Sequence, residues 1–486
     1  MKINHYKIIL NIYIIVMVFL SSCITSPDKD LSLSGNINLK DSDFHNDIAV
    51  AIYELESVNN SLSSPVGNAF IRSEFRMDPI ENQERINAFP TGDWVELFDH
   101  RQQKPLQIAY TDTNGNFKFN NVKSGTYNLV ILKDNYSLKY ICNLEVIDKQ
   151  TIISPSPIIL LPRISMPQLV TELFVFEANT QYYFSQNTAF IGDVTFESDV
   201  LLSIEENRKI DFYGTINIQT IDIQSPIWIT SACISILEPE TITYFDRINI
   251  NSESSVKLTH LKSTFMTSGI NISSSNTIIE HSYFNNNNRA IVVNGGEITI
   301  NDVVVSNSSN RAIDINANQT IETNKISIFN SLLFNNYIAL SASLTELLVH
   351  NNYFIENNTA VTVEDYLLTA NNNIFHNNNS SIENFGSYAI ITYNVFSGNG
   401  SDDIIFWESR SRKTADGLVN NNNFLKNNNY YLRMRCLNGL VAVVADIDCT
   451  LNYFINNNIE NQIWDKHRNP SLIYQFVYEP RASVPF

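Results

Sequence analysis

Two arginines at matching positions in consecutive segments are the residues best suited to bind a charged ligand. Arg289 and Arg311 are 22 residues apart, and each follows an asparagine and precedes Ala-Ile. If the chain repeats with a period close to this spacing, the two guanidinium groups stack in neighbouring repeats, with Asp314 and Glu280 nearby. Because guanidinium groups bind carboxylates through paired hydrogen bonds, this set predicts a cradle for a carboxylated sugar. The alternative is that both arginines are surface residues that pair with neighbouring acids.

The sequence offers little other chemistry. Polysaccharide lyases need a base and a cation or basic side chains, and hydrolases need paired carboxylates. The sequence shows no matching pair of carboxylates, no calcium-binding cluster of aspartates and no nucleophile motif. The run Asp112-x-Asn114-x-Asn116 has half the pattern of a calcium loop, but it lacks the glycine of the sharp turn and has Lys123 where a bidentate glutamate is needed. We therefore predict no catalytic residue, no metal site and no cofactor.

The cysteines give one candidate disulfide. Four cysteines follow Cys23, and of these only Cys436 and Cys449 are close in sequence. They could meet across adjacent repeats and form a disulfide, or they could be buried thiols that act as small apolar residues. Both interpretations stay open. The histidines and methionines are scattered, which argues against a copper site.

The elements that must position these residues repeat along the chain. An aromatic residue followed by asparagines recurs at nearly equal intervals, at Phe334, Phe354, Phe375 and Phe396. A fixed period of about 20 residues predicts a stacked solenoid. The next two intervals, to Phe424 and then to Phe454, are longer than the earlier ones. The longer intervals predict loops inserted at turns, one of them containing residues 408–413.

Alternation within a repeat predicts which side chains face inward. Residues 312–315 and 360–363 read Ala-Ile-Asp-Ile and Ala-Val-Thr-Val. A period of two places the apolar residues inside and Asp314 or Thr362 outside. The phenylalanines should then stack as an aromatic column. The asparagines should adopt left-handed turn conformations and pass amide hydrogen bonds from coil to coil as a ladder. About twelve or thirteen coils are expected.

The region ahead of the clear repeats resembles the entry coils of exported right-handed parallel β-helix proteins. Residues 189–196, 200–204 and 209–218 carry this resemblance. It implies a β-helix over residues 171–460, a fold shared with polysaccharide lyases, epimerases and hydrolases. Within such a scaffold, function is expected in the loops between Phe396 and Phe454 or at outward positions around the two arginines.

The C-terminal tail, residues 461–486, is similar to the closing segment of a subset of these proteins, including the periplasmic β-helix of the copper-maturation pathway. Those proteins often have Trp-Gly after Asn-Tyr in the last coil, whereas this chain has Phe454-Ile455. The tail is therefore predicted only as a cap over the final coil.

Residues 31–162 look like a carboxypeptidase-regulatory-type, transthyretin-like β-sandwich. The resemblance is carried by the run Thr-Asp112-x-x-Gly115-x-Phe117-x-Phe119-x-x-Val122-x-x-Gly125-x-Tyr127. Residues 110–119 are predicted to form a hairpin in which Asn114-Gly115 supplies the positive φ angles. An insertion near 56–91 departs from the compact form of that family.

The first residues indicate export. A lysine-containing start precedes an apolar stretch, and Leu20-Ser-Ser-Cys23 follows it. This pattern resembles the lipobox of bacterial lipoproteins, which implies a signal peptide over 1–22, lipid attachment at Cys23 and a polar tether over 23–30. The residue after Cys23 is not aspartate, which implies an outer-membrane lipoprotein, facing the periplasm or exposed at the surface. An ordinary signal peptide is the alternative.

Composition limits the partners. The chain has 486 residues and a formal net charge of −18, which argues against nucleic acid or anionic lipid as the main ligand. The predicted fold is all-β, a small antiparallel β-sandwich followed by a right-handed parallel β-helix. We expect a lipid-anchored surface protein whose β-helix presents an elongated, non-catalytic binding face to a polysaccharide or another surface molecule. The alternative is a membrane-tethered polysaccharide lyase or epimerase acting on uronate-containing glycans.

Overall fold

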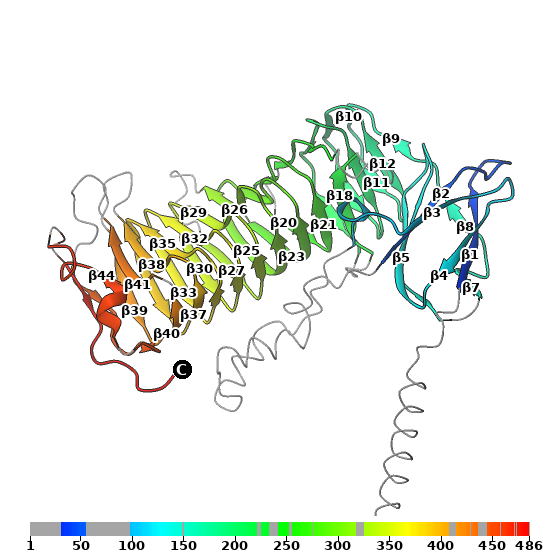
Figure 1. Ribbon diagram of the computed structural model, residues 1–486. Helices are drawn as coiled ribbons and strands as arrows, with labels where there is room; N and C mark the ends of the chain where they lie inside the picture. The colour runs from blue at the N-terminus through cyan, green and yellow to red at the C-terminus, as the bar shows by residue number, and fades with distance from the viewer. Residues whose placement is uncertain are drawn as a thin grey trace, which may run out of the picture. The chain divides into compact units, whose positions relative to one another are not determined.

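The protein is all-β, with a β-sandwich followed by a parallel β-helix (Figure 1). The computed structural model describes residues 31–54, 98–147, 150–220, 225–232, 242–251, 255–274, 276–316, 325–407, 415–427, 429–435, 445–456, 458–470, 472 and 474–485. The predicted signal peptide, tether, Cys23 and the insertion near 56–91 lie outside these residues. Among the described residues, no helix is long and apolar enough to cross a membrane. The chain divides into two compact units at Pro162.

The first unit is a sandwich of two sheets. Its elements are β1 (Leu31–Leu39), β2 (Ala49–Glu54), η1 (His100–Gln102), β3 (Gln107–Tyr110), β4 (Asn116–Val122), β5 (Gly125–Leu132), β6 (Lys139–Val146), β7 (Gln150–Ile152) and β8 (Ile158–Leu160). One sheet has the order β4–β1–β7, with β8 also paired to β1, and the other has the order β3–β2–β5–β6. Most pairs are antiparallel, but β1 pairs parallel with both β7 and β8. Alternate apolar residues of each sheet meet in one core.

The predicted hairpin over 110–119 is wrong in its pairing, because β3 and β4 belong to different sheets. The turn between them is held by Asp112, whose Oδ1 accepts hydrogen bonds from the backbone N–H groups of Asn114 and Asn116. Of Asn114 and Gly115, only Gly115 has a positive φ, of 79°. A Cβ at this position would lie 2.0 Å from the Ile37 carbonyl oxygen. The hydrogen bonds to the backbone of Asn116 lower the pKa of Asp112. This carboxylate therefore closes a turn that carries the chain from one sheet to the other.

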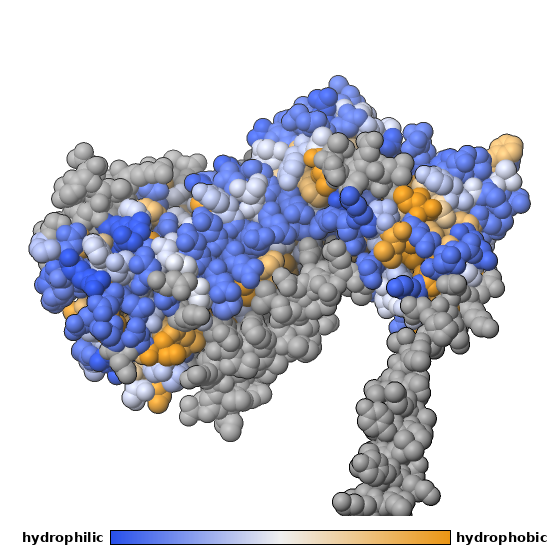
Figure 2. Space-filling view, in the orientation of Figure 1, coloured by the Kyte–Doolittle hydropathy of each residue, from blue (hydrophilic) through white to orange (hydrophobic). Residues whose placement is uncertain are grey.

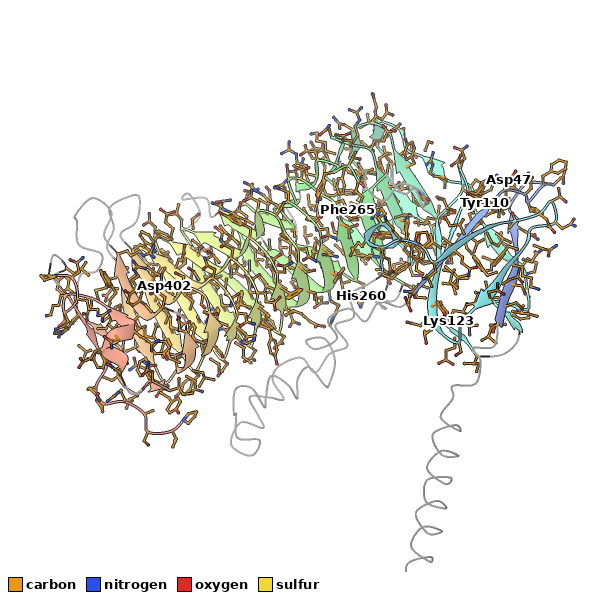
Figure 3. The ribbon with its side chains drawn as sticks, in the orientation of Figure 1. Asp47, Tyr110, Lys123, His260, Phe265 and Asp402 are labelled. Carbon is orange, nitrogen blue, oxygen red and sulfur yellow. The ribbon has the colours of Figure 1, made fainter. Side chains whose placement is uncertain are left out.

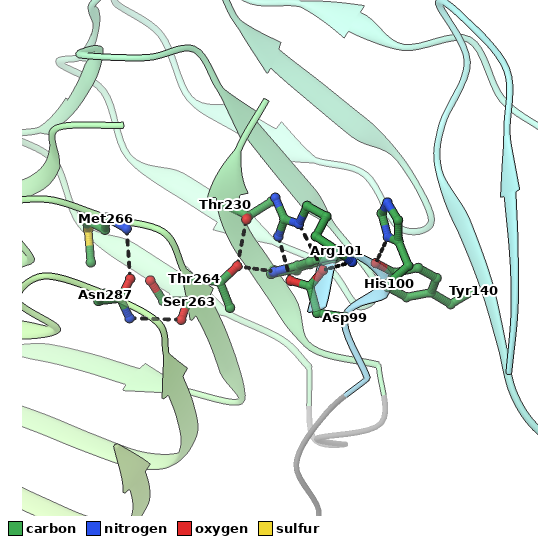
Figure 4. Close-up of polar contacts among 10 residues, drawn as sticks. Asp99, His100, Arg101, Tyr140, Thr230, Ser263, Thr264, Met266 and Asn287 are labelled. Carbon is green, nitrogen blue, oxygen red and sulfur yellow. Dashed lines mark hydrogen bonds and ion pairs between the residues drawn. The ribbon is translucent and has the colours of Figure 1, made fainter. Parts of the chain in front are cut away.

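A buried ion pair sits beside η1 in the first unit. Arg101 donates to both carboxylate oxygens of Asp99, at 2.9 and 2.6 Å (Figure 4). The neighbouring His100 Nδ1 lies 2.7 Å from the Tyr140 hydroxyl. Asp99 also accepts a hydrogen bond from the Arg101 backbone, so the pair fixes the start of η1.

In the second unit each coil contributes up to three short strands, one to each of three parallel faces. Sheet 1 has a three-stranded part and a longer part, comprising β11 (Phe174–Phe176), β14 (Val194–Phe196), β17 (Ile216–Ile218), then β20 (Val256–Thr259), β23 (Asn276–Asn285), β25 (Glu297–Ser306), β27 (Lys325–Phe329), β30 (Glu346–His350), β33 (Leu367–Asn371), β36 (Tyr388–Thr392), β39 (Asp416–Asn420), β42 (Ile447–Asp448) and β45 (Phe476–Val477).

Sheet 2 includes the second halves of β23 and β25, which run around the corner from sheet 1. Its other strands are β9 (Ile164–Ser165), β12 (Gln181–Phe184), β15 (Leu201–Ile204), β18 (Ile227–Ser231), β21 (Leu261–Thr264), β28 (Leu332–Phe334), β31 (Tyr353–Ile355), β34 (Ile374–His376), β37 (Val395–Asn399), β40 (Asn423–Asn427) and β43 (Tyr453–Phe454).

Sheet 3 is a single 13-stranded parallel sheet, in agreement with the expected number of coils. Its strands are β10 (Leu169–Val170), β13 (Thr188–Phe190), β16 (Lys209–Phe212), β19 (Arg247–Asn251), β22 (Ile270–Ser273), β24 (Ile291–Val293), β26 (Arg311–Asn316), β29 (Ile338–Ser343), β32 (Thr359–Glu364), β35 (Ser380–Phe385), β38 (Asp402–Trp407), β41 (Tyr430–Arg435) and β44 (Ile463–Trp464), the last preceded by η2 (Ile459–Gln462). Parallel pairing thus extends on both sides of the predicted range 171–460.

One continuous core fills the β-helix. The predicted aromatic column is confirmed from Phe354 onward, where successive rings stack with centroids 4.9 to 5.0 Å apart. Phe334 is not part of this column. It pairs in register with Ile355, and Leu333 takes the place below Phe354. Phe334 is therefore one residue beyond the position of the column and packs outside the main core. For this reason the interval from Phe334 to Phe354 is shorter than the intervals that follow it.

The asparagines act at two successive positions of a turn. The first position has a positive φ, as at Asn351 and Asn372, and it turns the chain from sheet 1 to sheet 2. The second is buried, and its side-chain oxygen accepts the backbone N–H of the equivalent residue in the preceding coil. The predicted ladder is confirmed and is double, with one series through Asn352, Asn373, Asn394, Asn422 and Asn452 and another through Asn336, Asn357, Asn378 and Asn399.

Candidate ligand-binding face

The outward positions of sheet 3 form the candidate site, which we call the outer face of sheet 3. On β26 the side chains of Ile313 and Ile315 enter the core, so Asp314 between them faces outward. Register pairing places Ser341, Thr362, Glu383, Ile405 and Arg433 in line with it on the following strands. In Figure 2 the visible surface of the β-helix is mainly hydrophilic.

The three predicted site residues do come together, and we call them the Asp314 cluster. Arg311 Nη1 lies 2.9 Å from Asp314 Oδ1, and Arg289 Nη1 lies 3.5 Å from Asp314 Oδ2. The Asp314 side chain is 2% exposed, whereas both arginine side chains are 37% exposed. One buried carboxylate therefore holds two solvent-facing guanidinium groups. Glu280 is not part of the cluster, because it pairs with Lys257 on sheet 1.

A second cluster lies on the same face near the C-terminal end of the β-helix, and we call it the Asp402 cluster after the residue labelled in Figure 3. Asp402 on β38 is fully buried. Its Oδ2 accepts hydrogen bonds from Arg433 Nη1 at 3.3 Å, from Arg435 Nη2 at 3.1 Å and from the Ser401 hydroxyl at 3.1 Å. The arrangement repeats the first cluster, with two guanidinium groups on one buried acid.

Aromatic rings flank the second cluster. The Arg435 guanidinium lies 4.7 Å from the centroid of the Trp407 ring, and this ring stacks on Phe385 at 5.4 Å. On the other side, the Arg433 guanidinium lies 5.1 Å from the Tyr430 ring centroid. Such contacts hold the planar guanidinium groups in place. The strand register accounts for the contacts of Trp407, because Phe385, Trp407 and Arg435 are paired residues on three consecutive strands.

Several polar atoms of the Asp402 cluster lack a partner. Within the described part of the chain, no hydrogen bond reaches Asp402 Oδ1, Trp407 Nε1 or the Nε atoms of Arg433 and Arg435, although all four atoms are buried. A buried polar atom without a partner is costly. Three of these atoms, Trp407 Nε1 and the two arginine Nε atoms, are N–H donors, which suit a ligand rich in acceptors, whereas Asp402 Oδ1 requires a donor such as a hydroxyl group.

The electrostatics of this cluster also favour an anion. Burial lowers the pKa of Arg435, and the adjacent Arg433 lowers it further. Burial raises the pKa of Glu383 on the neighbouring strand, against the effects of its hydrogen bond with Ser380 and of Arg435. Partial burial is the main cause of both shifts. A ligand carboxylate would add negative charge beside two guanidinium groups that have Asp402 and Glu383 as neighbours.

Sequence reasoning missed the Asp402 cluster. The sequence did point to the stretch between Phe396 and Phe454, where the cluster lies. Within that stretch, however, it singled out a loop over 408–413, which is outside the described residues. The available signal was Arg433-x-Arg435, which alternation places on one face of a strand. A further signal was the spacing of Phe385 and Trp407, which equals that of Arg289 and Arg311.

Metal ligands and cysteines were the other candidate groups in the sequence. In the described ranges, no group of three or more His, Cys, Asp or Glu residues could hold a metal ion. Cys449 is buried, and burial raises the pKa of its thiol. Cys449 is a free cysteine in the core, so the structure does not form the predicted disulfide with Cys436, which itself lies outside the described residues.

Comparison with known proteins supports the first unit alone. Residues 80–160 match the family model described as BOS complex subunit NOMO1-like, second beta sandwich domain. The matched family is a β-sandwich domain, which agrees with the β-sandwich that the sequence predicts for this unit. The match covers a small part of the chain. No significant match was found among curated proteins or among solved structures.

Proposed function

We propose that this protein is a lipid-anchored surface protein that binds acidic glycans, without catalysis, on the outer face of sheet 3. The observation that carries the proposal is the repeated arrangement of two solvent-facing arginines on one buried aspartate, at Asp314 and at Asp402. Guanidinium groups bind carboxylates in a bidentate manner. Aromatic rings such as Trp407 provide flat apolar surfaces on which a sugar ring can pack.

Binding to a panel of polysaccharides tests the proposal. The purified chain should bind uronate polymers and should not bind neutral glucans. Arg435→Gln should weaken binding by about tenfold or more, because a charge-assisted hydrogen bond is worth about 1.5–3 kcal/mol. Arg481→Gln is the matched control, since Arg481 forms an exposed pair with Glu479 on the tail. Equal binding of acidic and neutral polymers, or no binding to either, would contradict the proposal.

In this proposal, lipid attachment at Cys23 anchors the protein to the outer membrane. Stable anchoring requires more than one acyl chain, as the lipobox resemblance implies. Cys23→Ser should move the protein from the outer-membrane fraction to the soluble fraction, and metabolic labelling with a fatty acid should disappear. A variant that stays in the membrane fraction without label would count against the anchor.

A polysaccharide lyase or epimerase is the second candidate, and one observation favours it. Glu383 has a raised pKa beside Arg435 and Asp402, and a carboxyl group with a raised pKa is suited to general acid–base chemistry. The protein would then convert uronate polymers, releasing unsaturated products that absorb ultraviolet light if it is a lyase. Glu383→Gln should abolish that activity while leaving binding nearly unchanged. If prolonged incubation gives neither unsaturated products nor a change in the uronate composition of the polymer, both enzymatic activities are excluded and only the binding function remains.

A further inference from the structure

The two arginine clusters lie on one face of one rigid sheet. The Asp314 cluster is at β26 and the residues just before β24, and the Asp402 cluster is on β38 and β41. The strand order β26–β29–β32–β35–β38–β41 separates Arg311 from Arg433 by five strand steps. At about 4.8 Å per step, the two clusters are about 24 Å apart along the axis of the β-helix.

The strands between the clusters carry both short hydroxyl-bearing side chains and acidic side chains at their outward positions. β29 presents Ser341 and Ser343, and β32 presents Thr359 and Thr362. Glu364 on β32 and Glu383 on β35 lie in the same outward lines, so serine hydroxyl groups and carboxylates are both placed to form hydrogen bonds with the hydroxyl groups of an extended ligand. We call the two clusters and these intervening positions the outer track.

The charges of the outer track suit a sparse polyanion. Each cluster has two guanidinium groups around one buried carboxylate. Glu383 adds a second carboxyl group beside Arg435, so the excess of positive charge is larger at the Asp314 cluster than at the Asp402 cluster. A nucleic acid duplex carries one charge per about 1.7 Å and is bound by many basic contacts, which an acidic chain of net charge −18 does not provide. An acidic polysaccharide, with carboxylates on separate sugar rings and hydroxyl groups between them, matches both the ends and the middle.

We propose that the outer track binds a single acidic polysaccharide chain that runs parallel to the β-helix axis and bridges both clusters. Arg289 and Arg311 take one sugar carboxylate, and Arg433 and Arg435 take another, with Trp407 packing against a sugar ring at the second cluster. This inference rests on the proposed glycan-binding function and adds a two-point geometry to it.

Two-point binding predicts a length threshold. Once one cluster holds the chain, binding at the second becomes intramolecular and benefits from a high effective concentration. Oligomers that cannot span about 24 Å engage one cluster only and bind weakly. Oligomers long enough to reach both should bind about a hundredfold more tightly. Affinity should therefore rise in a step and not gradually with length.

The test measures binding of oligouronates of increasing length by calorimetry. Wild-type protein should show the step, and Arg311→Gln or Arg435→Gln should remove it, lowering the affinity of long oligomers to that of short ones. Glutamine keeps a hydrogen-bond donor near each buried aspartate, and thermal melting confirms that the variants are folded. The variant with both substitutions should bind long oligomers more weakly than either single variant, because neither cluster is then intact.

The outcomes separate the two proposals. A smooth rise of affinity with length, or a step that survives Arg311→Gln, would overturn the bridging geometry while leaving glycan binding intact. Absence of binding at every length would overturn the proposed function itself. Loss of the step in Arg481→Gln, the control outside the track, would show that the arginines act through general charge and would also overturn the two-point geometry.

Discussion

Asp403 is a buried carboxyl group at the end of the second asparagine ladder. Its Oδ1 accepts a hydrogen bond of 2.6 Å from Asn399 Nδ2. Burial raises the pKa of Asp403 to about 8, against the smaller effects of its hydrogen bonds with Asn427 and Asn399. An aspartate in an unfolded chain ionises near pH 4. Between about pH 4 and pH 8 the folded protein therefore holds a proton that the unfolded chain has released.

The sign of the pH dependence follows from this difference. Since the unfolded state binds fewer protons over the window, Asp403 makes the free energy of unfolding fall by about 1.4 kcal/mol per pH unit as the pH rises from 4 towards 8. Asp403→Asn should remove this contribution, so the variant should be close to wild type at pH 4 and clearly more stable at pH 8. Urea midpoints across this range measure it. Glu297→Gln, at an exposed position, should follow the wild-type curve, and parallel curves for Asp403→Asn would contradict the assignment.

At the residue scale, the sequence predicts a side chain well where alternation and period fix its direction. Asp314 is outward because Ile313 and Ile315 are inward, and the repeat spacing brings Arg289 to it. Asp402 was not predicted because it is followed by Asp403, and alternation alone does not say which of two adjacent aspartates faces out. Their opposite environments arise only when register places Asp402 beside β41.

The asparagine ladder is the element that joins one coil to the next at a corner. Asn373 is almost completely buried. Its Oδ1 accepts the backbone N–H of Asn352 at 3.0 Å, and its Nδ2 donates to the Val349 carbonyl at 2.9 Å and to Asn394 Oδ1 at 2.9 Å. Removing this side chain takes hydrogen bonds away from buried groups in the preceding coil and in the following coil.

Asn373→Ala should therefore lower the free energy of unfolding by about 2–4 kcal/mol, the cost of leaving more than one buried polar group unsatisfied. Thermal denaturation followed by circular dichroism measures the change. Asn372→Gly is the matched control, because Asn372 has a φ of 55° and glycine adopts this conformation without strain. The control should stay within about 1 kcal/mol of wild type. If both variants lose the same free energy of unfolding, the hydrogen bonds of the ladder contribute no more to stability than the turn does.

At the element scale, strand existence was predictable and strand pairing was less so. The repeat interval fixes parallel pairing throughout the β-helix, because each coil must lie on the previous one. In the sandwich no such constraint exists. Asn114-Gly115 is a strong hairpin signal, yet Asp112 closes the turn, and β3 and β4 separate into two sheets. A local turn motif does not decide which strands pair on either side of it.

The β-helix as a whole is held by contacts between neighbouring coils. Each strand of sheet 3 pairs only with the strands before and after it, and the core continues from coil to coil. Stability in such a solenoid is a sum of local terms. The rigidity of the outer track therefore depends on every coil between its two clusters, and the ends of the β-helix require side chains that cover the last core layer.

Phe476 covers the last layer at the C-terminal end. It is nearly fully buried, its ring centroid lies 5.9 Å from that of Phe406, and its backbone N–H donates to Asp465 at 3.0 Å. Phe476→Ala should cost about 3–5 kcal/mol locally, because it opens a cavity at an end that has neighbours on one side only. Hydrogen exchange should accelerate in β39 to β45 and remain unchanged in β23 to β30. Val477→Ala, at the adjacent and more exposed position, should have little effect. Acceleration throughout the β-helix would mean that it unfolds as one cooperative unit, and the two clusters of the outer track would then be lost together.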